Sequence, residues 1–159
     1  MGMRAARLIM ISSMALAVSC SSGGPSYEEV AAELQKDVQR LEAHDVFKNP
    51  EKKLRILQRA DVDIPCGRNR FLRVLRATAD YERADESLVA HLDRAENLME
   101  NALARDLGYE LDYDASQSDA EDGRFITGEK ETFGIKVTVY IASEAPTWRI
   151  RAITPCMER

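Results

Sequence analysis

The chain has 159 residues, of which 45% are hydrophobic and 31% are charged. This length allows one domain and a targeting segment but excludes a second core of ordinary size, and the composition excludes both a disordered chain and an integral membrane protein. The first 19 residues hold two basic residues, Arg4 and Arg7, and no acid, so the remainder carries 20 basic against 27 acidic residues and a formal charge of −7; this sign argues against nucleic acid as a partner.

Residues 1–19 have the layout of a secretory signal peptide. The basic start is followed by an apolar stretch from Leu8 to Val18, which is too short to cross a bilayer, and by Leu16-Ala17-Val18-Ser19-Cys20. This ending resembles the lipobox of bacterial lipoproteins, although Ala17 stands where that family usually has leucine. The resemblance implies that Cys20 is lipidated and becomes the new N-terminus. The alternative is an ordinary cleaved signal followed by an incidental cysteine.

A lipidated Cys20 predicts the location of the whole protein. Two acyl chains, such as palmitate, on one cysteine give a stable anchor, so we expect a protein held on the extracytoplasmic side of the cell membrane with the lipid membrane as its first partner. Residues 20–26, rich in serine and glycine, then form a flexible spacer. Residues 27–159 form a single globular α+β domain.

The first part of this domain is predicted to be helical. Residues 27–42 carry apolar residues at helical spacing, and Ser26 with Glu29 predicts a capping box. Asn49-Pro50-Glu51 predicts the start of a shorter second helix, with Leu54, Leu57 and Ala60 on one side and an end before Pro65. Residues 69–81 fit either a helix or a strand, and a strand is favoured.

The second part combines one long helix with strands. Apolar residues spaced by three and four predict a helix from about Asp85 to Leu107, which Gly108 ends. Alternating patterns then predict strands over residues 109–114, 124–130, 133–141 and 148–152, with Pro146 in a turn. The fold class is therefore α+β: an antiparallel sheet of order β-α-β-β-β-β, with the long helix packed on one face and preceded by the two N-terminal helices.

Cys66 and Cys156 are an even pair in a compartment that we expect to be oxidising, which predicts a disulfide bond between the first and last strands of the sheet. A redox-active or nucleophilic cysteine is the alternative, but the chain offers neither a Cys-x-x-Cys spacing nor a histidine close to either cysteine.

Short motifs add a resemblance to a known group. They are the lipobox, the Ser/Gly spacer, Ile64-Pro65-Cys66-Gly67, Leu107-Gly108-Tyr109-Glu110 and Thr154-Pro155-Cys156. In this order they resemble small uncharacterised actinobacterial (streptomycete-type) cell-envelope lipoproteins. The resemblance implies the paired cysteines and the α+β layout and favours a strand for residues 69–81. It implies no activity and no binding residues.

The search for chemistry gives few candidates. His44 and His91 are both expected at the surface, because neither has a metal-ligand or nucleophile spacing. The acidic segment Asp112–Asp122 fails the calcium-loop template in both registers tried, which leaves an irregular calcium site as the alternative. We expect no catalytic residues, no metal ligands and no cofactor.

A basic cluster is the last feature of note. Arg68, Arg70, Arg73 and Arg76 are interpreted as solvated or paired with acids, and the alternative is a site for an anionic polymer or for lipid headgroups. The expected tether, the small size and the lack of catalytic motifs predict a binding or interaction module of the cell envelope, with an envelope protein or a cell-wall component as partner. The alternative is an exported enzyme or metal-binding domain that uses Asp112, Asp114 and Asp122.

Overall fold

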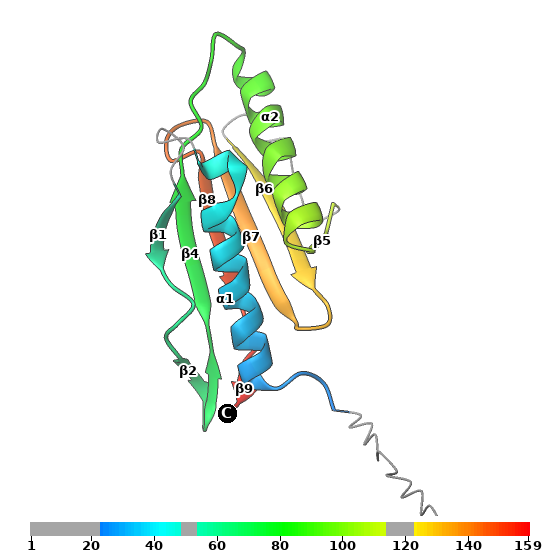
Figure 1. Ribbon diagram of the computed structural model, residues 1–159. Helices are drawn as coiled ribbons and strands as arrows, with labels where there is room; N and C mark the ends of the chain where they lie inside the picture. The colour runs from blue at the N-terminus through cyan, green and yellow to red at the C-terminus, as the bar shows by residue number, and fades with distance from the viewer. Residues whose placement is uncertain (1–22, 49–53, 114–122) are drawn as a thin grey trace, which may run out of the picture.

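The computed structural model describes residues 23–48, 54–113 and 123–159 (Figure 1). Its elements, in chain order, are α1 (Tyr27–Ala43), η1 (Asp45–Phe47), β1 (Arg55–Gln58), β2 (Ile64–Gly67), β3 (Arg70–Leu72), β4 (Val74–Ala79), α2 (Leu88–Asn101), η3 (Ala102–Asp106), β5 (Glu110–Leu111), β6 (Gly123–Lys130), β7 (Ile135–Ala142), β8 (Trp148–Ile153) and β9 (Met157–Glu158). The predicted α+β class, with antiparallel pairing and one long helix, is confirmed.

A six-stranded antiparallel sheet of order β1-β4-β8-β7-β6-β5 forms the centre of the molecule. Residues 70–79 are strands rather than helix, as favoured from the sequence, and β4 pairs with β8 along its whole length. Strands β5 to β8 follow one another as a meander. Because side chains alternate between the two faces of a strand, each long strand has one buried and one solvated set of residues.

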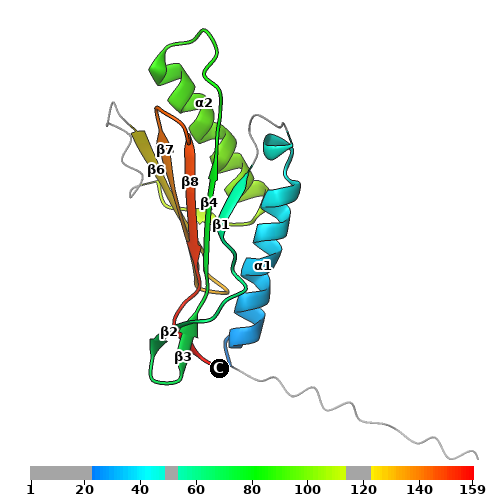
Figure 2. The same cartoon turned by 90° about the vertical axis from the view of Figure 1, so that its left-hand side faces the viewer.

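Both long helices cover the same face of this sheet, while the other face is left open by the elements that the structure describes (Figures 1 and 2). Leu34 of α1, Leu92 and Met99 of α2, and Trp148 of β8 are all almost fully buried between the layers. The Trp148 indole N–H donates to the carbonyl of Ala95 at 3.1 Å, which joins the sheet to α2.

Both helices begin at serine caps. The Ser26 hydroxyl accepts from the Glu29 N–H at 3.2 Å while the Glu29 carboxylate accepts from the Ser26 N–H at 2.7 Å, and Ser87 caps α2. At its other end, α2 continues into the wider turns of η3. The helix stops where Gly108 adopts φ +76°, a conformation that side-chain-bearing residues seldom adopt.

The second predicted helix is wrong. Residues 49–53 lie outside the described residues, and Arg55–Gln58 form strand β1, which pairs with β4. The apolar residues of the expected helical stripe do not share a face: Leu54 and Ala60 are buried but Leu57 is 64% exposed. Pairing with the edge of β4 therefore outweighed the local helical pattern.

Two of the predicted strands are shorter than expected. The strand predicted over residues 109–114 is reduced to β5, and Tyr113 is 66% exposed instead of sharing the buried side of Tyr109. Strand β7 begins at Ile135 rather than at Phe133, because residues 131–134 form a turn in which Gly134 has φ +63°.

A small sheet of order β2-β3-β9 joins the C-terminus to the body of the molecule. The predicted disulfide between Cys66 and Cys156 is confirmed, with the two Cα atoms 6.0 Å apart. This sheet, the C-terminus and the start of α1 lie at one end of the molecule, and α2 begins at the opposite end (Figures 1 and 2). Within the described ranges, we find no helix with the length and apolar character needed to span a membrane.

Candidate functional site: the open face of the sheet

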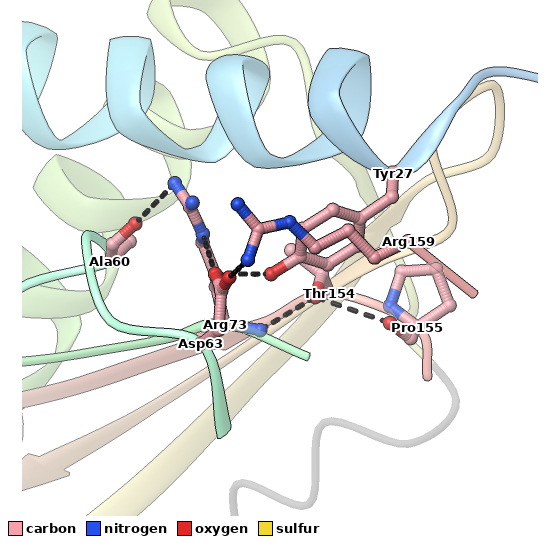
Figure 3. A network of polar contacts seen from close by, with 7 residues as sticks. All are labelled: Tyr27, Ala60, Asp63, Arg73, Thr154, Pro155 and Arg159. Carbon is pink, nitrogen blue, oxygen red and sulfur yellow. Dashed lines mark hydrogen bonds and ion pairs between the residues drawn. The ribbon is translucent and has the colours of Figure 1, made fainter. Parts of the chain in front are cut away.

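A network of polar contacts holds together the end of the molecule where α1 begins (Figure 3). Asp63 accepts from the Arg73 Nε at 2.9 Å, from Arg159 at 3.1 Å and from the Tyr27 hydroxyl. Hydrogen bonds from Tyr27 and Arg73 lower the pKa of Asp63. The Arg73 backbone N–H also donates to the Thr154 hydroxyl at 2.8 Å. Each of these polar side chains has a partner within the fold, so we assign the network a structural role.

A second polar cluster joins α1 to β6. The Lys130 ammonium donates to Glu33 at 2.8 Å and to Asp37 at 2.7 Å, and the Tyr109 hydroxyl donates to the other oxygen of Asp37 at 2.9 Å. Lys130 and Asp37 are only 7% and 1% exposed. Burial raises the pKa of Asp37 despite the nearby ammonium. Each member has a partner and little contact with solvent, so this cluster is also structural.

The two histidines are not equivalent. His44 is partly buried and its Nε2 lies 2.8 Å from Asp106. His91, expected on the solvated side of its helix, is only 1% exposed. That expectation is wrong because the Tyr81 ring stacks on the imidazole at a centroid distance of 5.3 Å and covers it.

His91 lines a hollow of about 500 Å³ at the start of α2. Its Nδ1 is 3.6 Å from Glu86, too far for a hydrogen bond, and burial lowers the pKa of the imidazole. No group of three or more potential metal ligands occurs among the described residues. His91 is therefore best described as a core histidine next to a shallow hollow.

Residues 114–122, which make up most of the acidic segment Asp112–Asp122, lie outside the described residues. Asp112 is described, and its backbone N–H donates to the carbonyl of Thr127 at 2.9 Å. The irregular calcium site and the carboxylate-based enzyme stay predictions.

The sequence-predicted arginine cluster is divided by the fold. Arg73 turns inward to Asp63, which confirms the expected pairing with an acid, and Arg70 donates to the carbonyl oxygen of Cys156. Arg76 instead lies on the open face of the large sheet. There its direct cross-strand partner is Arg151 of β8, and Arg149 follows two residues away on the same side of β8.

These three arginines, Arg76, Arg149 and Arg151, define what we call the arginine face. All three side chains are exposed. None forms an ion pair with any residue that the structure describes. Two like charges directly opposite each other on neighbouring strands are unfavourable for folding. The pair Arg76 and Arg151 therefore costs stability unless something outside the described fold compensates it.

Aromatic side chains continue the arginine face across the sheet. Arg149 lies directly opposite Tyr140 of β7, and Tyr140 lies directly opposite Phe125 of β6. The Arg149 guanidinium is 5.4 Å from the centre of the Tyr140 ring, and the Tyr140 and Phe125 rings are 4.8 Å apart. Phe125 is 45% exposed. The result is a row of one cation and two rings on a solvated surface.

The absence of a side chain at Gly123 leaves space for the Tyr140 ring. A Cβ atom added there would lie 2.5 Å from the Tyr140 hydroxyl and 2.7 Å from the carbonyl oxygen of Ile141. Glycine at this position therefore lets the Tyr140 side chain lie across the start of β6. Beside the row, Arg76, Arg151, Gln58 and Val74 line a hollow of about 390 Å³.

Positive and negative side chains lie on different parts of the open face. The arginine face occupies β4 and β8, whereas the β5–β6 side carries Glu110, Asp112, Glu129 and Glu131 around a separate hollow. Lys136 lies on this second side and faces Glu129 at 3.8 Å. Uncompensated positive charge is thus concentrated on the central strands.

Sequence reasoning singled out Arg76 but missed Arg149 and Arg151. The signal for them was present, since both alternate with the apolar residues Trp148, Ile150 and Ala152 and so must lie on the solvated side of a strand. That they lie beside Arg76 follows only from the register of β4 against β8.

Comparisons of the chain with protein-family models, with curated proteins and with solved structures give no match.

Proposed function

We propose that this protein is a lipid-anchored binding module on the extracytoplasmic side of the cell membrane, and that the open face of its sheet is the surface that meets its partner. The signal-like leader and Cys20 support the anchor. The confirmed disulfide supports export, because structural disulfides persist mainly in oxidising compartments.

The placement of the chain ends supports a display function. Residues 23–26 enter α1 at the same end as the C-terminus and the small sheet (Figure 2). A spacer over residues 20–26 would reach at most about 25 Å when extended. The disulfide and the Asp63 network strengthen this end of the fold, where a tether would act. The open face runs from there along the length of the sheet.

The single observation that carries the proposal is the arginine face. A chain with a net charge of −5 has more acids than bases, so cations on its surface can readily be paired. Three exposed arginines nevertheless share one sheet face without an acidic partner among the described residues. Such a feature weakens folding and is useful for recognising a ligand of opposite charge.

The experiment has two parts, the anchor and the surface. Mass spectrometry of the mature N-terminus and fractionation of cells expressing the wild type or Cys20→Ala test the anchor. We expect a diacylglyceryl adduct on Cys20 and release of the variant from the membrane fraction. An unmodified Cys20 in a membrane-free protein would remove the lipid anchor from the proposal.

For the surface, a photo-crosslinking amino acid replaces Thr138, which is exposed on the open face, or Gln39, which is exposed on α1 as the matched control. We expect a reproducible envelope adduct from position 138 and none from position 39. Equal yields at the two positions would contradict the assignment of the open face.

A further inference from the structure

We infer that the ligand of the arginine face is an anionic carbohydrate polymer, in which phosphate, sulfate or carboxylate groups recur along a chain of sugars. This inference rests on the proposed function and specifies the chemistry of its partner. It is carried by the arrangement of Arg76, Arg149 and Arg151 together with Tyr140 and Phe125.

The arginines are spaced for a ligand with repeated charges. Arg149 and Arg151 are two residues apart on β8 and therefore about 7 Å apart along the strand. Arg76 and Arg151 are direct cross-strand neighbours, so their Cβ atoms are about 5 Å apart. Guanidinium groups can each donate two parallel hydrogen bonds to an oxyanion. Several guanidinium groups at this spacing suit successive anionic groups better than one isolated anion.

The rings of Phe125 and Tyr140, which we call the aromatic row, are suited to recognise the sugars of the polymer. Phe125 is 45% exposed, and Tyr140, which contacts both Phe125 and Arg149, is half-buried. The apolar faces of sugar rings can pack on such rings, while the guanidinium holds an adjacent anionic group. A polymer that carries both sugars and charges uses the whole row, whereas a simple polyanion uses only the arginines.

The net negative charge of the chain does not prevent this binding. At physiological ionic strength the Debye length is about 8 Å, so charges separated by more than this distance are largely screened. A ligand lying on β4 and β8 therefore responds mainly to the arginines beneath it. Helices α1 and α2, with their acids, lie on the other side of the sheet (Figure 2). Glu129, an acid on the open face, is four residues from Phe125 on β6 and so about 13 Å away along the strand, beyond the Debye length.

Other occupants fit the surface less well. Lipid headgroups would meet a basic patch near the anchored end, but Arg149 is the second residue of β8, which starts at the opposite end of the sheet (Figure 1). A protein partner usually requires a central apolar patch. On the described strands, the large apolar residues that are exposed, Phe125 and Leu57, lie on separate strands, β6 and β1.

The test measures binding of the full-length chain in detergent micelles to four immobilised probes. These are heparin and polygalacturonate as charged glycans, inorganic polyphosphate as a charged polymer without sugars, and dextran as a neutral glycan. The face variant is Arg76→Gln/Arg149→Gln/Arg151→Gln. The matched control, Arg40→Gln/Arg83→Gln/Arg105→Gln, removes the same charge from exposed positions outside the open face.

We expect the wild type to bind at least one charged glycan and not dextran. The face variant should lose affinity by about tenfold or more while the control stays within about twofold of the wild type. Binding should weaken as salt increases, with a shallower dependence in the face variant. Retention of Trp148 fluorescence and the same unfolding midpoint show that each variant is folded.

A second variant distinguishes the contribution of the sugars to binding from that of the charges. Phe125→Ala/Tyr140→Ala should weaken glycan binding and leave polyphosphate binding nearly unchanged. Equal weakening for both probes would overturn the role of the aromatic row. Loss of binding in the control variant to the same extent as in the face variant would overturn the assignment of the arginine face.

Three further outcomes would replace the inferred ligand. They are stronger binding to poly-glutamate peptide, stronger binding to vesicles of anionic phospholipid, and concentration-dependent self-association that requires the arginines. Any of these outcomes would refute the inferred polymer ligand. The proposed function would still hold, provided that position 138 crosslinks to an envelope partner. If that crosslink is also absent, the proposed function itself fails.

Discussion

Replacement of Lys130 by methionine should destabilise the protein strongly, because it leaves Glu33 and Asp37 without their shared cation. Asp37 is 1% and Glu33 is 13% exposed, so water can solvate them only poorly. Removing one partner of a buried charge pair typically costs about 3–5 kcal/mol of unfolding free energy. The matched control, Lys136→Met, removes an ammonium that is 68% exposed, and we expect a loss of less than about 1 kcal/mol.

Urea unfolding followed by tryptophan fluorescence measures this difference. The chain has one tryptophan, and Trp148 is fully buried, so its emission reports unfolding of the core. With an m-value of about 2 kcal/mol/M, Lys130→Met should lower the midpoint by about 2 M. Asp37→Asn combined with Lys130→Met should recover part of the loss, because the amide oxygen still accepts from Tyr109. If Lys130→Met and Lys136→Met shift the midpoint equally, the buried cluster does not have the role assigned to it.

Three further predictions concern stability. Burial lowers the pKa of His91 below its ordinary value of 6.5, so below that pH the unfolded chain takes up a proton that the folded chain does not, and the protein becomes less stable as the pH falls. The difference in unfolding free energy between pH 7.5 and pH 5.5 should therefore be smaller for His91→Phe than for the wild type. An unchanged difference would contradict the burial of His91. Cys66 and Cys156 are 90 residues apart, and the chain-entropy model predicts that replacing both lowers the unfolding free energy by at most about 4–5 kcal/mol relative to the oxidised wild type. A stability equal to that of the wild type would show that the pairing of β3 with β9 alone fixes the C-terminus. Gly108→Ala should cost about 1 kcal/mol, because Gly108 has φ +76° with open space around it; a neutral result would mean that η3 ends differently.

The parts of the fold that sequence predicted well are those with a long, regular pattern. Four alternating apolar residues from Ile135 to Ile141 determine which side of that strand is buried, and the helix that begins at Leu88 repeats its apolar spacing over several turns. The cysteine pair was also predicted, since the expected oxidising compartment and the even count of remaining cysteines both favour a bond.

The parts that failed depend on contacts distant in sequence. Strand β1 is short, and the spacing of Leu54, Leu57 and Ala60 favours a helix until β4 offers an edge with which to pair. His91 looked solvated because its burial comes from Tyr81, which lies outside the helix. The cluster of Lys130 with Asp37 joins residues 93 positions apart, and a local pattern cannot predict such a contact.

The same limit applies to the candidate site. The alternation of β8 is sufficient to place Arg149 and Arg151 on a solvated face. Their position beside Arg76, and that of Arg149 beside Tyr140, depends on the order and register of three strands. An isolated arginine on a strand is unremarkable, so the site becomes visible only in the assembled sheet.

The most direct test of the central claim is crosslinking from position 138 in intact cells, with and without the arginine face. The account predicts an envelope adduct from position 138 in the wild type that falls at least several-fold in Arg76→Gln/Arg149→Gln/Arg151→Gln, at equal protein level and equal membrane retention. The control Arg40→Gln/Arg83→Gln/Arg105→Gln should keep the adduct. An adduct of unchanged yield in the face variant, or none in the wild type, would contradict the claim that this open face binds a partner in the envelope.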